Sequence, residues 1–141
     1  MSYTYEYPRP MVTVDALVFA GNRPDLKVLL IRRGNEPFKG QWALPGGFVD
    51  MDEPLYDAVV RELYEETGLQ IVDFRQLHTF GNPGRDPRGR NITTVYISQI
   101  DAPLQPTAGD DAAVAQWFSL DELPPLAFDH EDVIAMGLTV V

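Results

Sequence analysis

The chain has 141 residues, of which 21 are acidic, 11 are lysine or arginine and none is cysteine, so its net charge is −10. This length suits a single domain, 1–141, with a buried core, and the lack of cysteine excludes disulfides and zinc–thiolate sites. The longest apolar run, residues 16–20, is too short to cross a membrane. Residues 91–141 contain no lysine or arginine to form a basic stripe for nucleic acid. We therefore expect a cytoplasmic protein with neither a membrane nor a nucleic-acid partner.

Residues 1–10, MSYTYEYPRP, are predicted to form an extended N-terminal arm. Alternating tyrosines in this arm suit an edge strand or a contact between two copies of the chain. These are Tyr3, Tyr5 and Tyr7. A frayed terminus explains the same composition equally well.

Two strands and a loop are predicted to follow the arm. Met11–Ala20 and residues 26–33 are rich in aliphatic and β-branched residues, and the short turn between them indicates a hairpin. Residues 34–41 are predicted to be a loop. In the next stretch, WALPGGFV, the segment Pro45-Gly46-Gly47 is not expected to be regular structure. Two glycines let the backbone approach a ligand closely, and a tight turn without a ligand is the alternative.

Residues 47–69, GFVDMDEPLYDAVVRELYEETGL, are predicted to form a loop and then a helix with clear start and stop signals. Asp52 and Glu53 place negative charge where the free backbone N–H groups of a helix favour it. Pro54 suits the first turn, because its missing N–H costs nothing there. Gly68 is placed to end the helix in a left-handed C-cap.

Three carboxylates share one edge of this helix. At about 100° per residue, Glu62 and Glu66 lie about 40° apart, and Glu65 lies about 60° to the side of Glu62. Such close like charges repel, and a hard divalent cation such as Mg²⁺ would reconcile them; a solvated charged face is the alternative. Arg61 can pair with Glu65 or reach back to Glu53, so we interpret it as an orienting residue rather than a ligand. The adjoining arc should face the core; it holds Tyr56, Val59, Val60 and Leu63.

The segment after the helix combines a strand with a basic loop. Residues 71–80 are predicted to be a strand, and residues 81–90, GNPGRDPRGR, a loop that gathers three arginines in an otherwise acidic protein. This loop could contact the phosphates of a substrate. A surface loop with solvated arginines, tied to Asp86, explains the composition equally well.

The remaining residues are predicted to add two strands and two short helical segments. These are a strand at 91–101, a loop at 102–111 that ends in Asp110-Asp111, a strand at 114–118, a turn or short helix at 120–125, and a helix at 130–137. Neither His78, in a strand, nor His130, at a helix start, is expected to be catalytic. Strands that alternate with helical segments indicate an α/β fold with a mixed β-sheet between helices.

The pattern G-x5-E-x7-R-E-U-x-E-E-x-G-U, with U apolar, is matched at every position of residues 47–69. It is the signature of the Nudix hydrolases, and the chain strongly resembles that family. The resemblance implies an α/β/α sandwich and hydrolysis of a nucleoside diphosphate linked to another group. It also implies Mg²⁺, with Mn²⁺ as an alternative, held by Glu62 and Glu66 with Glu65 close by and the Gly46 carbonyl.

The resemblance leaves the general base open between a motif glutamate and an acidic residue from a later loop. Our catalytic candidates are Glu65, Arg61 and Glu53 from the motif and Asp111 from the later loop. Asp110 is an adjacent candidate. Capping of a turn is the alternative role of this aspartate pair.

Three flanking stretches, YPRPMVTVDALVF, PGRDPRGR and AGDDA…WFSLDELPPLAFDH, resemble the ADP-ribose pyrophosphatase branch of the family. This implies cleavage of ADP-ribose into AMP and ribose 5-phosphate by a homodimer. Arg85 and Arg88 would then contact phosphates or ribose, Trp42 or an arm tyrosine would stack on adenine, and Gly47 would lie against the substrate.

Two other functions remain as alternatives. A pyrophosphohydrolase that removes modified (d)NTPs would use the same motif with a different base pocket. A non-catalytic ADP-ribose sensor would carry a decayed motif followed by a winged DNA-binding domain; the complete motif and the chain end at Val141 argue against it.

Overall fold

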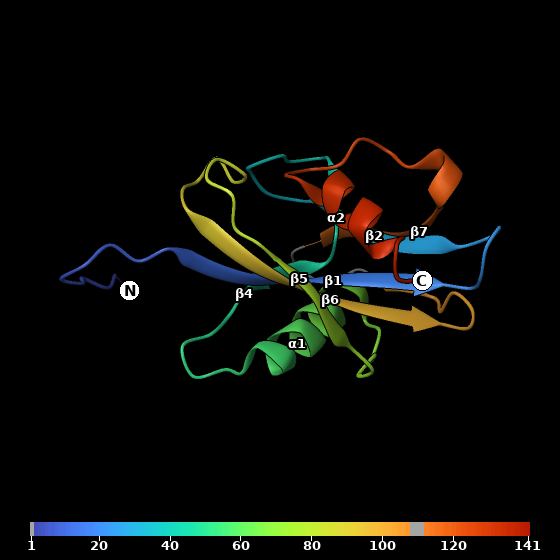
Figure 1. Cartoon of the computed structure of the whole chain (residues 1–141), viewed down its shortest axis with the longest axis horizontal. Helices are drawn as coiled ribbons and strands as arrows, with labels where there is room; N and C mark the ends of the chain where they lie inside the picture. The colour runs from blue at the N-terminus through green and yellow to red at the C-terminus, as the bar shows by residue number, and fades with distance from the viewer. Residues whose placement is uncertain (1, 108–111) are drawn as a thin grey trace.

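The computed structural model describes residues 2–107 and 112–141, except for the side chains of residues 112 and 113. Figure 1 shows a sheet with one helix on each side. The strands are β1 (Met11–Ala20), β2 (Lys27–Arg33), β3 (Trp42–Ala43), β4 (Gly46–Phe48), β5 (Arg75–Phe80), β6 (Asn91–Ile100) and β7 (Ala112–Ser119). The helices are α1 (Leu55–Thr67), the 3-10 helix η1 (Leu120–Glu122) and α2 (His130–Gly137).

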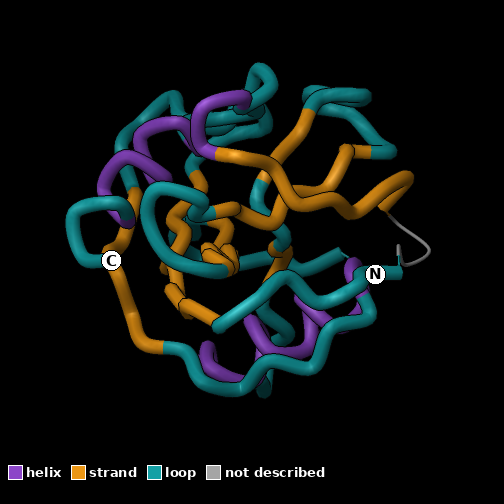
Figure 2. The backbone as a smooth tube through the Cα atoms, turned by 90° about the vertical axis from the view of Figure 1, so that its right-hand side faces the viewer, coloured by secondary structure: helices purple, strands orange, loops and turns teal. Residues whose placement is uncertain are grey.

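The sheet is mixed, as predicted. Its order is β3-β2-β1-β6-β5, with β4 also paired to β1 and β7 to β2. β1 and β6 run parallel over ten residue pairs, whereas the other pairings are antiparallel. The view in Figure 2 also places helices on both sides of the strands. The predicted α/β/α sandwich is therefore confirmed.

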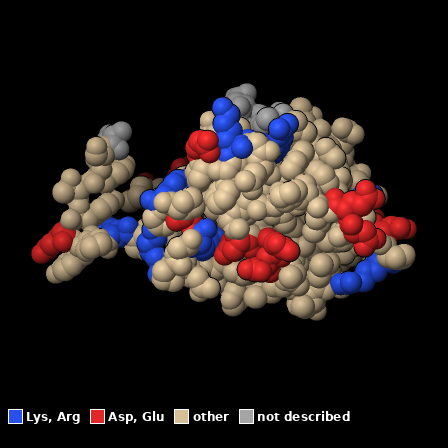
Figure 3. Space-filling view, turned by 90° about the horizontal axis from the view of Figure 1, so that it is seen from above, with Lys and Arg blue, Asp and Glu red and all other residues tan. Residues whose placement is uncertain are grey.

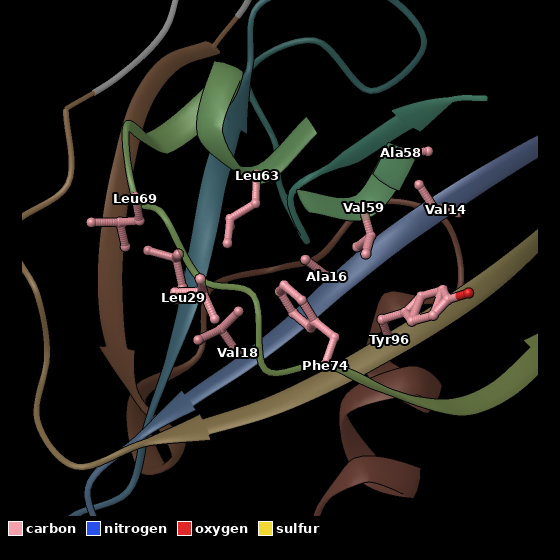
Figure 4. Close-up of a cluster of buried hydrophobic side chains, with 11 residues drawn as sticks. Val14, Ala16, Val18, Leu29, Ala58, Val59, Leu63, Leu69, Phe74 and Tyr96 are labelled. Atoms are coloured by element: carbon pink, nitrogen blue, oxygen red, sulfur yellow. The ribbon is translucent and has the colours of Figure 1, made fainter. Parts of the chain in front are cut away.

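The central strand β1 is buried on both faces of the sheet. Successive side chains of a strand point to opposite faces, so Val14, Ala16 and Val18 pack under α1, whereas Leu17 and Phe19 pack under α2. Figure 4 shows Val59 and Leu63 of α1 pointing toward the first group. Burial of each such aliphatic side chain contributes about 1.5–3 kcal/mol, so the core fixes α1 against β1.

Two predictions for the core and the sheet were wrong in part. Tyr56 does not face the core: it is 39% exposed and meets the Tyr96 ring edge-on, with 6.0 Å between ring centroids. The strand predicted over residues 71–80 begins only at Arg75. Ile71 and Phe74 are instead buried in the core under α1, which keeps their segment out of the ladder with β6.

Gly46 and Gly47 form regular structure, contrary to prediction. They lie in β4, opposite Asp15 and Val14 of β1. A Cβ on Gly46 would collide with the backbone oxygen of Val14, and a Cβ on Gly47 would lie 2.6 Å from the Glu62 carboxyl carbon. The glycines therefore let β4 fit between β1 and α1, a close approach that glycine alone allows.

The N-terminal arm extends away from the domain body (Figure 1) and, over residues 2–10, forms no strand. Its tyrosines are exposed. Tyr3 stacks on Tyr5 with 6.2 Å between ring centroids, and the Arg9 guanidinium lies 3.8 Å from the centre of the Tyr5 ring. Among the described residues, no helix is long and apolar enough to span a membrane.

Candidate active site

Helix α1 presents its carboxylates toward β4 and β1. Its N-cap is Pro54, and Gly68 ends it with φ of 71° and an N–H bond to the Tyr64 carbonyl, as predicted. The backbone N–H of Gly46 donates to Glu66 Oε1 at 3.2 Å. The strand and the helix are thus joined where the sequence predicts a metal.

Glu66, which is buried, and Glu62, which is partly buried, form a carboxyl pair. Glu66 is only 8% exposed, and the two side chains lie within hydrogen-bonding reach of each other. Burial, followed by the negative charge of Glu62, raises the pKa of Glu66 well above its usual range. Burial also raises the pKa of Glu62, although hydrogen bonds from Glu66 and Arg61 oppose it. The pair therefore favours sharing a proton or binding a cation over carrying two uncompensated charges.

Arg61 connects Glu62 of this pair to other carboxylates. Its guanidinium donates to Glu53 at 2.7 and 2.8 Å, to Glu62 at 2.9 Å and to Glu65 at 3.1 and 3.2 Å. It also donates to the Phe48 carbonyl at 3.2 Å. Arg61 thus contacts both predicted partners and holds Glu62 in place. The Glu65 side chain is 53% exposed and does not line the cavity described next.

A cavity of about 480 Å³ opens beside the carboxyl pair, between α1, the ends of β1, β2 and β4, and the 81–90 loop. The residues that line it include carboxylates and glycines, namely Asp15, Gly46, Gly47, Asp50, Glu62 and Glu66, and cationic and ring-bearing side chains, namely Arg33, Arg85, Arg88, Phe48, Phe128 and His130. On the face drawn in Figure 3, acidic and basic atoms lie interspersed, with no continuous basic stripe. The cavity therefore combines cation-binding and anion-binding groups within one small volume.

Arg85 and Arg88 line the cavity, but both are held by aspartates. Arg85 donates to Asp129 at 2.6 and 2.9 Å, and its side chain is 4% exposed. Arg88 donates to Asp86 at 2.8 and 3.1 Å. Burial alone would raise the pKa of Asp86, but hydrogen bonds from Arg88 and Asn91 lower it. In the absence of a ligand, Arg88 is therefore tied to Asp86, as one of the two predictions for this loop expects.

Trp42 does not line the cavity. Its ring packs against Phe118, with 4.8 Å between ring centroids, because its position in β3 directs it into the core under α2. Asp110 and Asp111 lie outside the described residues.

Several cavity residues were not predicted from the sequence, among them Asp15, Arg33, Phe48 and Phe128. A lone carboxylate within the apolar run of β1 could have indicated Asp15, which is buried and accepts a 2.6 Å hydrogen bond from Thr93. The other three carry no local signal, since only the tertiary fold brings them together.

His130 is structural, in agreement with expectation. It is buried, and its Nδ1 accepts the Leu44 N–H at 3.0 Å, which leaves Nε2 protonated and 3.9 Å from Asp15 Oδ1. Burial lowers the pKa of His130, although Asp15 and Asp129 oppose it. His130 therefore ties α2 to the segment before β4.

We predict that His130 weakens the fold in acid. Because its pKa is lowered on folding, the unfolded chain takes up the proton first, and the free energy of unfolding falls as pH drops below about 6.5. His130→Asn keeps an acceptor for Leu44 and does not titrate. Denaturant titrations at pH 7 and pH 5 should show that the free energy of unfolding falls less in this variant than in the unaltered protein. The difference should be up to about 1.4 kcal/mol per pH unit. His78→Asn, at an exposed site in β5, should lose as much free energy of unfolding between pH 7 and pH 5 as the unaltered protein. An equal loss in the unaltered protein and both variants would contradict the prediction.

The donor set fits a hard divalent cation. Two adjacent carboxyls with raised pKa values offer the oxygen ligands that Mg²⁺ and Mn²⁺ take. In the described part of the chain, no three histidine, aspartate or glutamate side chains converge into a complete metal cage. Further ligands would therefore be backbone, water or substrate oxygens, as is usual for Mg²⁺.

Comparison with known proteins agrees with this geometry. A family model described as the NUDIX domain matches residues 9–136. The chain is 49% identical over 129 residues to the ADP-ribose pyrophosphatase of Methanocaldococcus jannaschii, covering 91% of this chain and 73% of that relative.

Two solved structures are similar over most of the chain. The NUDIX domain of Shewanella oneidensis NrtR, complexed with ADP ribose, is 36% identical with a TM-score of 0.88, covering 94% of this chain and 89% of that one. A bifunctional NMN adenylyltransferase/ADP ribose pyrophosphatase from Francisella tularensis, complexed with AMP and a manganese ion, is 34% identical with a TM-score of 0.85. This match covers 96% of the chain but only 43% of the larger protein.

Proposed function

The chain belongs to the Nudix family, and from that premise we propose that it hydrolyses ADP-ribose to AMP and ribose 5-phosphate with Mg²⁺. The observation that carries the proposal is the Glu62–Glu66 carboxyl pair in a cavity that three arginines also line. A diphosphate carries the negative charge that both a cation held by the carboxyl pair and the arginines of the cavity would attract. The likeness to an ADP-ribose pyrophosphatase at 49% identity supports ADP-ribose as the substrate.

The residues around the carboxyl pair would have distinct roles in this reaction. Glu62 and Glu66, with the Gly46 carbonyl, would hold the cation, which when bound neutralises phosphate oxygens and makes a coordinated water more acidic. Arg61 holds Glu62 in a fixed rotamer through its contacts with Glu53. Gly47 leaves the space that the Glu62 carboxylate occupies. Glu65 and Asp111 are the proposed candidates for the base.

The reaction itself is a hydrolytic displacement at phosphorus. The oxygen of water bonds to one phosphorus, the bridging P–O bond breaks, and the other phosphate leaves with that bond pair. The base accepts the proton that the attacking water loses. Mg²⁺ is the proposed cation, and Mn²⁺, present in the Francisella tularensis structure, is the alternative.

Turnover of a substrate panel with Mg²⁺ would test the proposal. The panel contains ADP-ribose, NADH, a dinucleoside polyphosphate, and ordinary and oxidised (d)NTPs, with products identified by chromatography. We expect the highest kcat/KM for ADP-ribose, with AMP and ribose 5-phosphate as products. Preference for a nucleoside triphosphate would instead support the (d)NTP alternative.

An ADP-ribose sensor is the second candidate, because the chain resembles the NUDIX domain of NrtR, complexed with ADP ribose. The motif is complete in this chain, which favours catalysis. Binding of ADP-ribose without turnover of any panel member, with either Mg²⁺ or Mn²⁺, would favour the sensor.

A homodimer and a cytoplasmic location stay predictions. The exposed tyrosines of the arm provide an aromatic surface for a second copy. Light scattering should give about twice the mass of one chain, and removal of residues 1–10 should lower that value; the mass of a single chain would end the dimer prediction. Fractionation of cells that express the protein would test the location.

A further inference from the structure

Arg33 differs from the other arginines of the cavity. It is the last residue of β2, and its backbone N–H donates to the Gln41 carbonyl at 2.8 Å. Its Nε donates to the Pro37 carbonyl at 2.7 Å. These two bonds fix the strand end and the guanidinium plane. Within residues 2–107 and 112–141, the two terminal nitrogens of Arg33 have no acceptor, and no carboxylate lies within 4.0 Å.

Arg85 and Arg88, by contrast, each donate Nε and one terminal nitrogen to a carboxylate. Arg85 is paired with Asp129 at 2.6 Å, and Arg88 with Asp86 at 2.8 Å. Among the described residues, Arg33 is therefore the arginine of the three whose two terminal nitrogens are both open to an incoming anion. A planar guanidinium binds two oxygens of a phosphate at once, and such charge-assisted pairs are the strong hydrogen bonds of proteins.

Phe128 supports Arg33 in this orientation. The Arg33 guanidinium carbon lies 5.0 Å from the centre of the Phe128 ring, and that of Arg88 lies 5.8 Å from the same centre. Phe128 has φ of 53°, a left-handed conformation that is rare for a bulky residue and concentrates at functional sites. The Phe38 ring holds it edge-on, with 4.8 Å between centroids. Stacking on an aromatic face leaves the edge of a guanidinium free for hydrogen bonds.

The electrostatic setting also favours an anion at this position. Burial lowers the pKa of Arg33, the nearby Arg88 lowers it further, and the Glu66 carboxylate opposes both effects. Arg33 therefore lies within electrostatic range of Glu66, which lines the same cavity. A bound diphosphate would place negative oxygens between two guanidinium groups that otherwise repel each other.

We propose that Arg33, stacked on Phe128, binds non-bridging oxygens of the substrate diphosphate, and that Arg85 and Arg88 shape the cavity through their aspartates. The proposal rests on the proposed function for the identity of the substrate. Its chemistry, a diphosphate anion held by a forked guanidinium, does not depend on which groups flank the diphosphate.

Arg33→Gln tests the proposal, with Arg32→Gln as the matched control. Arg32 is the preceding residue of β2, is exposed, and also donates its Nε to a backbone carbonyl, that of Gly40 at 3.0 Å. It does not line the cavity. The probe is methylenediphosphonate with Mg²⁺, a diphosphate analogue whose P–C–P link water does not cleave, and its binding is measured by calorimetry.

Arg33→Gln should weaken binding of this probe by about 10- to 100-fold, the loss expected for a charge-assisted contact. Arg32→Gln should change it less than about two-fold. Arg33→Lys, which keeps the charge but not the fork, should fall between them. For ADP-ribose, Arg33→Gln should raise KM by a similar factor and change kcat only a few-fold, because this contact exists before and during reaction.

Unaltered probe binding by a folded Arg33→Gln variant would overturn the proposal, as would a protein that does not bind the probe at all. If Arg33→Gln does not fold, Arg33→Lys is measured instead. A several-fold loss of probe affinity in Arg33→Lys would support the proposal, and unaltered affinity would overturn it. Failure to hydrolyse ADP-ribose would overturn the proposed function but not this subsite, provided that the probe binds and Arg33→Gln weakens it.

Discussion

Glu66→Gln is expected to lower kcat for ADP-ribose by about 10³-fold or more while the fold stays intact. Glu66 is the more buried member of the carboxyl pair, and glutamine keeps its shape and its bond from the Gly46 N–H. Glutamine cannot carry the negative charge that a divalent cation requires, and loss of such charge stabilisation is worth several kcal/mol. Steady-state kinetics over a range of Mg²⁺ concentrations would measure the loss.

The same variant should gain stability in the absence of divalent cations. The pKa of Glu66 is raised on folding from its ordinary value of 4.5, so the folded chain retains a proton that the unfolded chain releases. In a chelating buffer, the contribution of Glu66 to the free energy of unfolding is fully present below about pH 4.5. This contribution is lost as pH rises through the raised pKa. Glu66→Gln should show a shallower decline above pH 4.5. Excess Mg²⁺ should stabilise the unaltered protein and not the variant, because a ligand that binds the folded state adds to its stability.

Glu131→Gln, at an exposed position in the first turn of α2, serves as the control for charge removal. It should preserve both turnover and the Mg²⁺-dependent stabilisation. Near-normal turnover by Glu66→Gln would show that this residue does not hold the cation.

The helix that carries the carboxyl pair was predictable from sequence because its geometry is local. The angle between Glu62 and Glu66 follows from helical periodicity, and the start and stop signals of α1 stand within a few residues of its ends. The same is true of β1 and α2, whose observed bounds equal those predicted.

The arginine-bearing part of the cavity was not predictable in the same way, because it is assembled from segments far apart in the chain. Arg33 ends β2, whereas Phe128 precedes α2, and no spacing rule links them. Composition indicated Arg85 and Arg88 because they share a basic loop, but it could not indicate that Asp129, more than forty residues later, holds Arg85. Trp42 was assigned to the substrate for its ring alone, and the register of β3 places that ring against Phe118.

The glycines of β4 show how one strand serves both fold and site, and their substitution should separate the two. A Cβ on Gly46 meets backbone atoms of Val14 and Asp15, which cannot move without breaking the β1 ladder. Gly46→Ala should therefore destabilise the fold by about 3 kcal/mol, a fall in Tm of about 10 °C. Thermal unfolding followed by circular dichroism would measure it.

Gly47→Ala should instead impair catalysis with a smaller loss of stability. Its Cβ would lie 2.6 Å from the carboxyl carbon of Glu62, the far end of a flexible side chain that can move aside. Moving it displaces a proposed cation ligand by about 1 Å, a misplacement that reduces rate by about 10²-fold. Gly81→Ala, whose Cβ would meet only Ile92 at ordinary contact distances of 3.5 and 3.7 Å, should alter neither property. If Gly47→Ala kept full kcat, the position of the Glu62 carboxylate would not limit turnover. If Gly47→Ala lost as much stability as Gly46→Ala, the close approach of β4 to α1 would serve packing alone.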